Sequence, residues 1–220
     1  MVNIMALQID FHTHTYMSKD SLTTPERFIA IARRKKLDRV VVTDHNSIAG
    51  ALAAQALDPE RIIVGEEIMT TQGEILAAFV SEEVPRGLSP LETIGRLRNQ
   101  GAFISVSHPF DSWRNGAWKL EDLLEITPLV DAIEIFNARC TSSRDNLRAV
   151  DFARQNNLPG TAGSDAHAAF ELGKARLELP EFIGADGLRK VIRDGHLLGG
   201  LSPFWVHTAS WYARWRKMVV

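Results

Sequence analysis

Residues 39–46 have the sequence Arg-Val-Val-Val-Thr-Asp-His-Asn. A short run of β-branched apolar residues is typical of a strand buried inside a sheet. Here the run ends in side chains that can bind a metal ion or transfer a proton. The same order, an apolar run followed by a polar cluster, recurs along the chain. The clusters are Asp10–His14, Thr43–Asn46, Gly65–Glu67, Ser107–Pro109, Asn137–Cys140 and Gly163–His167.

Strand and helix patterns alternate along most of the chain. The strands are expected at Ile4–Ile9, Arg39–Thr43, Arg61–Val64, Ile75–Val80, Ala102–Val106, Ala132–Phe136 and near Thr161. Helices are expected at Glu26–Leu37, Ser47–Leu57, Leu91–Gln100 and Ser143–Asn156, two of them opened by a Thr-Pro or Ser-Pro pair that suits a helix start. This alternation predicts an α/β fold with a mostly parallel sheet, which we expect to be a distorted, TIM-like seven-stranded β/α barrel. A doubly wound sheet is the alternative.

One segment breaks the alternation. Residues 61–80 contain two strand patterns separated by only six residues, 69–74, which is too short for a crossover helix. We therefore expect a hairpin-like pair at this place in the sheet.

Composition limits the classes of function. The chain has 220 residues, a formal net charge of −2 and one cysteine. These values favour one domain, residues 1–201, with an aromatic and basic extension at 202–220. No leader pattern and no possible disulfide point to secretion, so the expected location is the cytoplasm. No apolar run approaches the roughly 20 residues of a membrane span, and no basic excess indicates a grip on long nucleic acid.

The carboxyl ends of parallel barrel strands share one rim, so the polar clusters should meet there. His12 and His14, two residues apart, can point to the same side, and Asp165 and His167 repeat that spacing. Nine residues are candidate metal donors: His12, His14, Asp20, His45, Glu67, His108, Cys140, Asp165 and His167. That number exceeds the needs of one ion and predicts two or three divalent ions and hydrolytic chemistry.

Any one of these clusters has a simpler explanation. A single His-x-His pair is often only a pair of polar residues at a strand end. Asp10 and Asp44 are expected to orient neighbouring imidazoles rather than to bind metal. Glu66 and Glu67 cannot both point into the barrel. His196 and His207 have no partner cluster and are expected to be ordinary surface or core histidines.

The ordered motif series resembles that of the polymerase and histidinol phosphatase (PHP) family. The matching stretches are Asp10–His14, Ser18–Asp20, Thr43–Asn46, Gly65–Ile68, Ser107–Pro109, Ile133–Asn137 and Gly163–His167. The resemblance implies a distorted seven-stranded barrel, up to three zinc, manganese or iron ions, and hydrolysis of a phosphoester. The expected substrate is a small phosphate monoester or short nucleotide ester, attacked by a hydroxide that bridges the ions.

The resemblance also implies residue roles. His12, His14, Glu67 and Asp165 would hold the first ion, Glu67, His108 and Cys140 the second, and Asp20, His45 and His167 the third. Glu67 is chosen over Glu66 because the family ligand directly precedes a hydrophobic residue, here Ile68. Glu67, Asp165 and His167 would form the catalytic core. The expected substrate-binding residues are Lys19, Arg114, Arg139 and Arg144, each of which could equally be a solvated surface charge.

Two other interpretations stay open at this stage. Cys140 could act as a covalent nucleophile. Alternatively, the chain could be a non-catalytic metal-binding regulatory or interaction module of the same fold. The extension favours the second idea, because its tryptophans and basic residues, within 203–217, could contact a membrane surface or a partner. The simpler expectation is that the tryptophans fold back and cover apolar surface of the barrel.

Overall fold

The computed structural model describes residues 6–114 and 116–219. Their strands are β1 (Ala6–Asp10), β2 (Arg39–Val42), β3 (Ile62–Met69), β4 (Glu74–Ala78), β5 (Phe103–Val106), β6 (Ala132–Asn137), β7 (Gly160–Gly163), β8 (Ala175–Pro180) and β9 (His196–Gly199). The α-helices are α1 (Pro25–Arg34), α2 (Ala49–Leu57), α3 (Pro90–Asn99), α4 (Leu120–Ile126), α5 (Ser143–Gln155), α6 (Gly184–Val191) and α7 (Val206–Met218). Ile4 and Met5 of the first expected strand lie outside the described residues.

Local sequence accounts for several helix starts. The Thr24 side chain accepts the Arg27 N–H at the start of α1, with Pro25 in the first turn. At α3, Ser89 and Glu92 form a reciprocal capping box, again followed by a proline. Such caps satisfy backbone N–H groups that have no partner within the helix. The four helices expected from sequence are therefore present, with ends within three residues of the expected ones.

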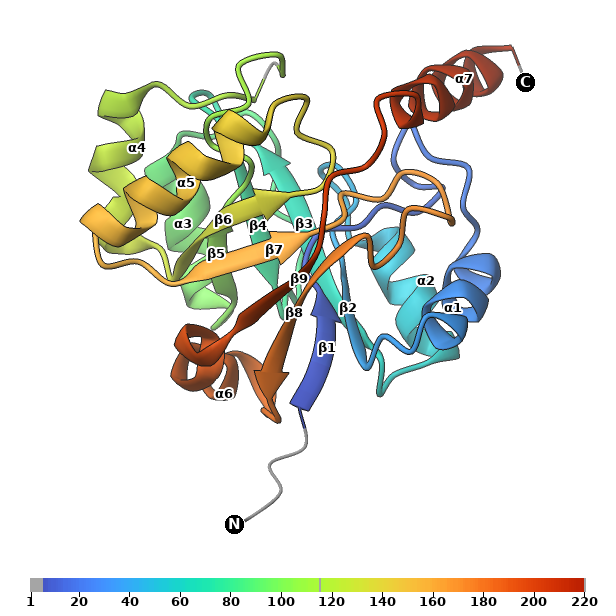
Figure 1. The fold of residues 1–220 in the computed structure, drawn as a ribbon, viewed down its shortest axis with the longest axis horizontal. Helices are drawn as coiled ribbons and strands as arrows, with labels where there is room; N and C mark the ends of the chain where they lie inside the picture. Colours follow the sequence, from blue (N-terminus) through green and yellow to red (C-terminus); the bar gives the residue numbers. More distant parts are fainter. Residues whose placement is uncertain (1–5, 115, 220) are drawn as a thin grey trace.

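The strands form one sheet with the order β7-β6-β5-β4-β3-β2-β1-β8-β9. β4 pairs antiparallel with both β3 and β5, which confirms the hairpin expected in residues 61–80. The sheet curves until its two sides meet, because the Phe11 N–H donates to the Ala162 carbonyl and the Asp165 N–H donates to the His12 carbonyl. The fold is thus a single-domain α/β structure with a nearly closed, barrel-like sheet (Figure 1).

The described residues contain nine strands rather than the seven expected. The two additional strands, β8 and β9, follow β7 and pair antiparallel with β1 and with each other. β8 alternates between buried and half-buried positions, and three of the four residues of β9 are exposed. Neither segment is therefore a continuous apolar run, which is the pattern on which the expected strands were identified.

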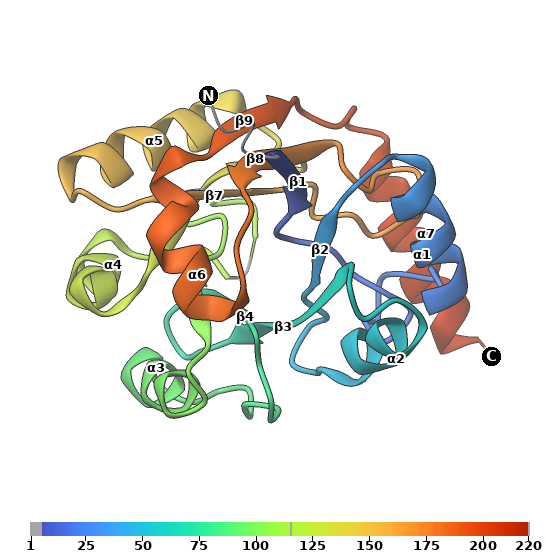
Figure 2. The same ribbon diagram turned by 90° about the horizontal axis from the view of Figure 1, so that it is seen from below.

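The interior of the sheet is closed at one end. Ile9, Val41, Ile63 and Phe103 point into it and belong to the same buried cluster as Leu188 of α6. In Figure 2 the strands curve round this interior, with α6 across the end nearer the viewer. A second cluster lies between the sheet and the outer helices. The carboxyl ends of the parallel strands are consequently the open end of the barrel.

No helix in the described ranges has the length and apolar character required to cross a membrane.

Candidate metal centre

The expected donor residues meet at the open end of the barrel. His12 and His14 follow β1, His45 follows β2, Glu67 lies in β3, and His108 follows β5. Asp165 and His167 follow β7, with Asp165 in a left-handed conformation at φ 52°. The side chains of these residues are buried except for that of His45, which is 20% exposed. Five strands, β1, β2, β3, β5 and β7, thus supply one cluster of imidazoles and carboxylates.

The first donor group combines the two strand ends that close the barrel. The His14 Nε2 atom lies 3.1 Å from His12 Nε2 and 3.2 Å from Asp165 Oδ1. His12 Nε2 lies 3.6 Å from the same Asp165 oxygen. Three donor atoms that face one another at these distances have the spacing needed to bind one cation.

Glu67 lies between several imidazoles. Its Oε1 atom is 3.1 Å from His108 Nε2 and 3.3 Å from His12 Nε2. Its Oε2 atom is 2.9 Å from His45 Nδ1 and 3.5 Å from His14 Nε2. The two oxygens of one carboxylate therefore face different histidines, which is the geometry that a bridging ligand needs.

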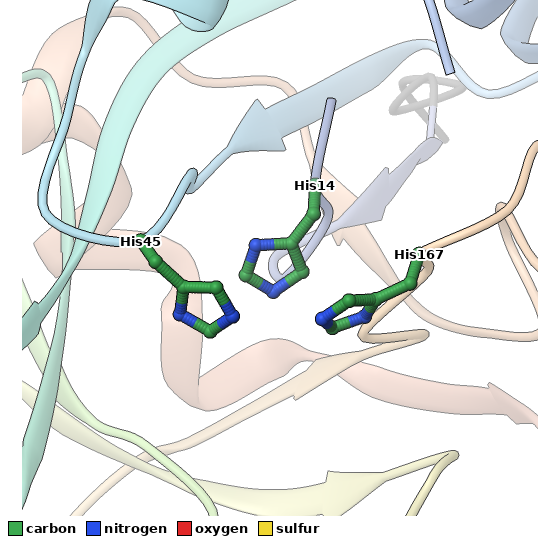
Figure 3. A group of neighbouring side chains, drawn as sticks. All are labelled: His14, His45 and His167. Carbon is green, nitrogen blue, oxygen red and sulfur yellow. The ribbon is translucent and has the colours of Figure 1, made fainter. Parts of the chain in front are cut away.

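A third group lies nearer the solvent. The rings of His14, His45 and His167 converge from three separate chain segments (Figure 3). Asp20 approaches them from the loop after β1, with its Oδ1 atom 3.4 Å from His167 Nε2 and 3.6 Å from His45 Nε2. Asp20 is thus close enough to share a cation with these rings.

Cys140, one of the nine expected donors, lies apart from the groups described above. Cys140 belongs to none of the donor groups found among the described residues. It follows β6 in a turn in which the Cys140 N–H donates to the Asn137 carbonyl, and burial raises the pKa of its thiol.

Glu74 is the residue that sequence reasoning missed. Its Oε2 atom lies 3.5 Å from His108 Nε2, and it forms a donor group with His45 and Glu67. β4 runs antiparallel to β3, so its first residue lies at the open end of the barrel, where the parallel strands finish. The expected hairpin was the signal that could have identified Glu74.

The electrostatics of the cluster fit bound cations. Burial disfavours the charged forms of both Glu67 and Asp165. The neighbouring His12 and His45 outweigh burial at Glu67 and hold its pKa well below the ordinary range. Arg114 and His12 do the same for the pKa of Asp165. Both groups are therefore ionised at neutral pH. Oxygen atoms of Asp20, Glu67 and Asp165 are buried without a hydrogen-bond partner. Ionised buried oxygens without donors are costly, and divalent cations would satisfy them.

Other buried groups fix the orientation of the donors. Glu134 Oε1 lies 3.0 Å from His12 Nδ1, and Ser18 Oγ lies 3.2 Å from His14 Nδ1. Asp44 accepts the hydroxyl of Ser18 at 2.6 Å, as well as backbone and hydroxyl donors of Thr15. Asp44 thus acts on His14 through Ser18.

Asp10 lies beneath the donor cluster. Burial raises its pKa to about 6. It accepts the N–H and hydroxyl of Ser164 and the N–H of Gly173, so it connects the ends of β1 and β7. Neither Asp10 nor Asp44 belongs to a donor group; Asp44 reaches the His14 ring through Ser18, whereas Asp10 accepts the backbone N–H of His12.

A cleft of about 550 Å³ opens above the cluster. Among the expected substrate-binding residues, Lys19, Arg114 and Arg139 line it. Arg114 Nη2 lies 2.5 Å from Asp165 Oδ2, which places this guanidinium beside the donors. Arg144, at the start of α5, is exposed and does not line the cleft.

The C-terminal helix forms part of the cleft wall. His207, Ser210 and Arg214 of α7 line it, which places the half-buried His207 at the cleft. α7 contacts the rest of the domain through Val206, Ser210 and Ala213, which are buried. Its tryptophans do not cover the barrel as expected, because Trp211 and Trp215 are 69% and 46% exposed.

Comparisons with known proteins agree with this architecture. The sequence model of a family described as PHP-associated (PHP_C) matches residues 143–197. An uncharacterized protein of Methanocaldococcus jannaschii is 34% identical over 178 residues, which are 80% of this chain and 71% of that protein.

Two solved structures share the fold. One is a two-domain protein from Bacteroides vulgatus that contains a predicted PHP-like metal-dependent phosphoesterase (TM-score 0.71, 19% identity, 95% of this chain and 70% of that chain). The other is a lesion-specific endonuclease of Pyrococcus furiosus (TM-score 0.62, 18% identity, 90% of this chain and 60% of that chain). From the motif series, the donor cluster at the strand ends and these matches, we conclude that the chain belongs to the PHP family.

Proposed function

We propose that the protein is a metal-dependent phosphoesterase that hydrolyses a small phosphate monoester or short nucleotide ester. The observation that carries the proposal is the set of overlapping donor groups, two of which share Glu67, at the base of a cleft lined with arginines. Buried carboxylates held ionised among imidazoles are the donors that divalent ions prefer. A cleft of about 550 Å³ also lies in the size range of small-molecule sites.

The proposed ligand set follows the geometry of the cluster. The first ion would be held by His12, His14, Glu67 and Asp165, and the third by Asp20, His45 and His167. For the second ion we propose Glu67, His108 and Glu74, with Glu74 in place of Cys140. Nitrogen and oxygen donors of this kind suit zinc, manganese or iron(II), and two or three ions are proposed.

When bound, the ions would supply a shared hydroxide as nucleophile and neutralise the phosphoryl oxygens. The chain's own residues would position the substrate. Arg114, beside Asp165, is placed to orient a phosphoryl group at the cluster, and Lys19 lies at the rim. Glu67, Asp165 and His167 would form the catalytic core by holding the ions in a fixed arrangement. No covalent nucleophile is needed, and the buried thiol of Cys140 is unsuited to that role.

The test uses two neighbouring glutamates. Protein purified without chelator is analysed for metal and assayed for phosphate release from nucleotides, sugar phosphates and histidinol phosphate. Glu67→Gln should lose bound metal and reduce kcat by about 100-fold or more, because a bridging carboxylate is removed. Glu66→Gln is the matched control. Glu66 faces away from the cluster and accepts the Val84 N–H, and burial raises its pKa to about 8, so its neutral carboxyl resembles an amide.

Two outcomes would contradict the proposal. If the wild-type protein binds metal but releases no phosphate from any class of ester, the alternative of a non-catalytic metal-binding module is favoured. If Glu67→Gln retains both metal and activity, the proposed ligand set is wrong.

A cytoplasmic location stays a prediction from the sequence.

A further inference from the structure

Arg139 carries a buried donor group with no partner. Its side chain is 3% exposed, and its Nη1 atom is buried without a hydrogen bond. The remaining nitrogens are used: Nη2 donates to Ser210 Oγ at 2.9 Å, and Nε lies 3.6 Å from Glu171 Oε2. A buried guanidinium N–H without an acceptor is costly. Because Arg139 lines the cleft, an anion bound there would supply the acceptor.

α7 adds further donors on the same side of the cleft. His207, Ser210 and Arg214 are three and four residues apart, so they share one face of the helix, and all three line the cleft. The Arg139 Nη2 atom also lies 3.4 Å from His207 Nδ1. This face therefore places a hydroxyl and an imidazole next to Arg139, and the guanidinium of Arg214 lines the same cleft.

The helix is fixed in this position at both ends. Val206 is buried near its start. Near its end, Lys217 donates to the carbonyls of Tyr16 and Ser18, the latter at 2.7 Å. Figure 1 shows α7 beside the loop that follows β1. Because the contact residues Ser210 and Ala213 are small, the helix can lie close to the cleft.

The local charge favours an anionic occupant. Residues 195–220 contain no aspartate or glutamate, whereas α7 contains three basic residues. Three acidic residues line the cleft: Asp20 and Glu74 lie in the donor cluster, and Asp111 pairs with Arg114 at 3.0 Å. Arg214 of α7 also lines the cleft, and no ion pair of Arg214 with a carboxylate is found among the described residues.

We propose that Arg139 and the α7 face formed by His207, Ser210 and Arg214 bind a second anionic group of the substrate, a phosphate or a carboxylate. The reacting phosphoryl group lies at the metal cluster beside Arg114. This inference rests on the proposed function and deepens it, since it makes α7 the element that selects bis-anionic phosphoesters. Bidentate binding by arginine suits both kinds of oxyanion.

The experiment compares Arg214→Ala with Arg216→Ala. Arg216 lies on the same helix, is exposed and does not line the cleft. Matched substrates are glycerol 3-phosphate against 3-phosphoglycerate, and adenosine 5′-monophosphate against adenosine 3′,5′-bisphosphate. The first pair tests whether the site recognises a carboxylate as the second anionic group, and the second pair tests whether it recognises a phosphate. In the pair where wild type prefers the substrate with two anionic groups, the preference is the ratio of its kcat/KM to that of the substrate with one. Arg214→Ala should lower this ratio by at least about tenfold, mainly through KM. Arg216→Ala should leave the ratio unchanged.

A binding measurement separates this inference from the proposed function. Inorganic phosphate is titrated calorimetrically into chelator-treated full-length protein. Wild type and Arg216→Ala should bind it, and Arg214→Ala should bind about tenfold more weakly. If phosphate binds in this way but no ester is hydrolysed, the proposed function fails and the anion site stands. If esters are hydrolysed without preference for bis-anionic substrates, or if Arg214→Ala changes neither the ratio nor phosphate binding, the inference is wrong.

Discussion

Two adjacent glutamates of β3 differ in charge because successive side chains of a strand face opposite sides of the sheet. Glu67 points among the imidazoles of the cluster, and its pKa is well below the ordinary value despite burial. Glu66 points outward, where burial and the nearby Glu83 raise its pKa to about 8. One residue of displacement along the strand therefore separates a charged donor from a neutral carboxyl group.

The roles of Glu74 and Cys140 can be separated by metal analysis. Glu74→Gln should lose about one equivalent of bound metal, because an amide is a weaker ligand than a carboxylate. Cys140→Ser should retain the wild-type content. Cobalt(II)-loaded wild-type protein should lack the near-ultraviolet charge-transfer absorption of a thiolate ligand. Loss of metal in Cys140→Ser together with such absorption in the wild type would restore Cys140 as the ligand.

Glu134 orients His12 from behind, at 3.0 Å from its Nδ1 atom. Glu134→Gln should weaken metal binding by about 10- to 100-fold, the usual effect of removing a carboxylate that supports a metal-bound histidine. Titration with a competing chelator measures this change. The exposed Glu125→Gln provides the control. Equal metal affinities in the two variants would show that His12 does not depend on Glu134.

At the scale of elements, Asp131 connects three parts of the fold. It accepts the Ile104 N–H of β5 at 2.9 Å, Arg98 of α3 at 2.7 Å and Arg189 of α6 at 3.1 Å. α6 closes the lower end of the barrel, so this carboxylate helps to hold that closure in place. Burial opposes its ionisation, but these donors outweigh burial and lower its pKa below the ordinary 3.8.

This pKa shift predicts a pH-dependent contribution to stability. A carboxyl group whose pKa is lower in the folded state stabilises the fold above the unfolded-state value, and the effect is lost as the pH falls through the folded-state value. Asp131→Asn should therefore reduce the free energy of unfolding by about 1–2 kcal/mol at pH 7. The difference from wild type should shrink as the pH falls below 3.8. Urea unfolding at pH 7, 5 and 3.5 measures it, and a difference independent of pH would contradict the explanation.

At the scale of the whole molecule, the open end of the barrel concentrates buried charge that the rest of the core lacks. One carboxylate oxygen each of Asp20, Glu67 and Asp165 is buried there without a hydrogen-bond partner, whereas the two large buried clusters of the barrel interior and of the layer beneath the helices are apolar. A ligand that binds only the folded state stabilises it by mass action. Metal binding should therefore couple directly to global stability.

Metal addition tests this coupling. Manganese or zinc at about 100 times its dissociation constant should stabilise the protein by about 2.7 kcal/mol per site. For a chain of this size, that energy corresponds to a rise in Tm of about 5–10 °C relative to chelator-treated protein. His12→Ala should show a smaller rise. The same rise in both proteins would indicate that the metal acts at another site.

The sequence by itself determined the α/β class, the hairpin at residues 61–80 and the polar strand ends at which His12, His14, His45, Glu67 and Asp165 meet. Those features follow from short-range periodicity and from the shared rim of parallel strands, both of which are local rules. Only the tertiary structure decided the outcomes that depend on contacts between distant segments. It brought Glu74 to the cluster because β4 is antiparallel, added β8 and β9, and placed His207, Ser210 and Arg214 at the cleft beside Arg139. No local pattern encodes these contacts, because each depends on how the whole sheet curves and closes.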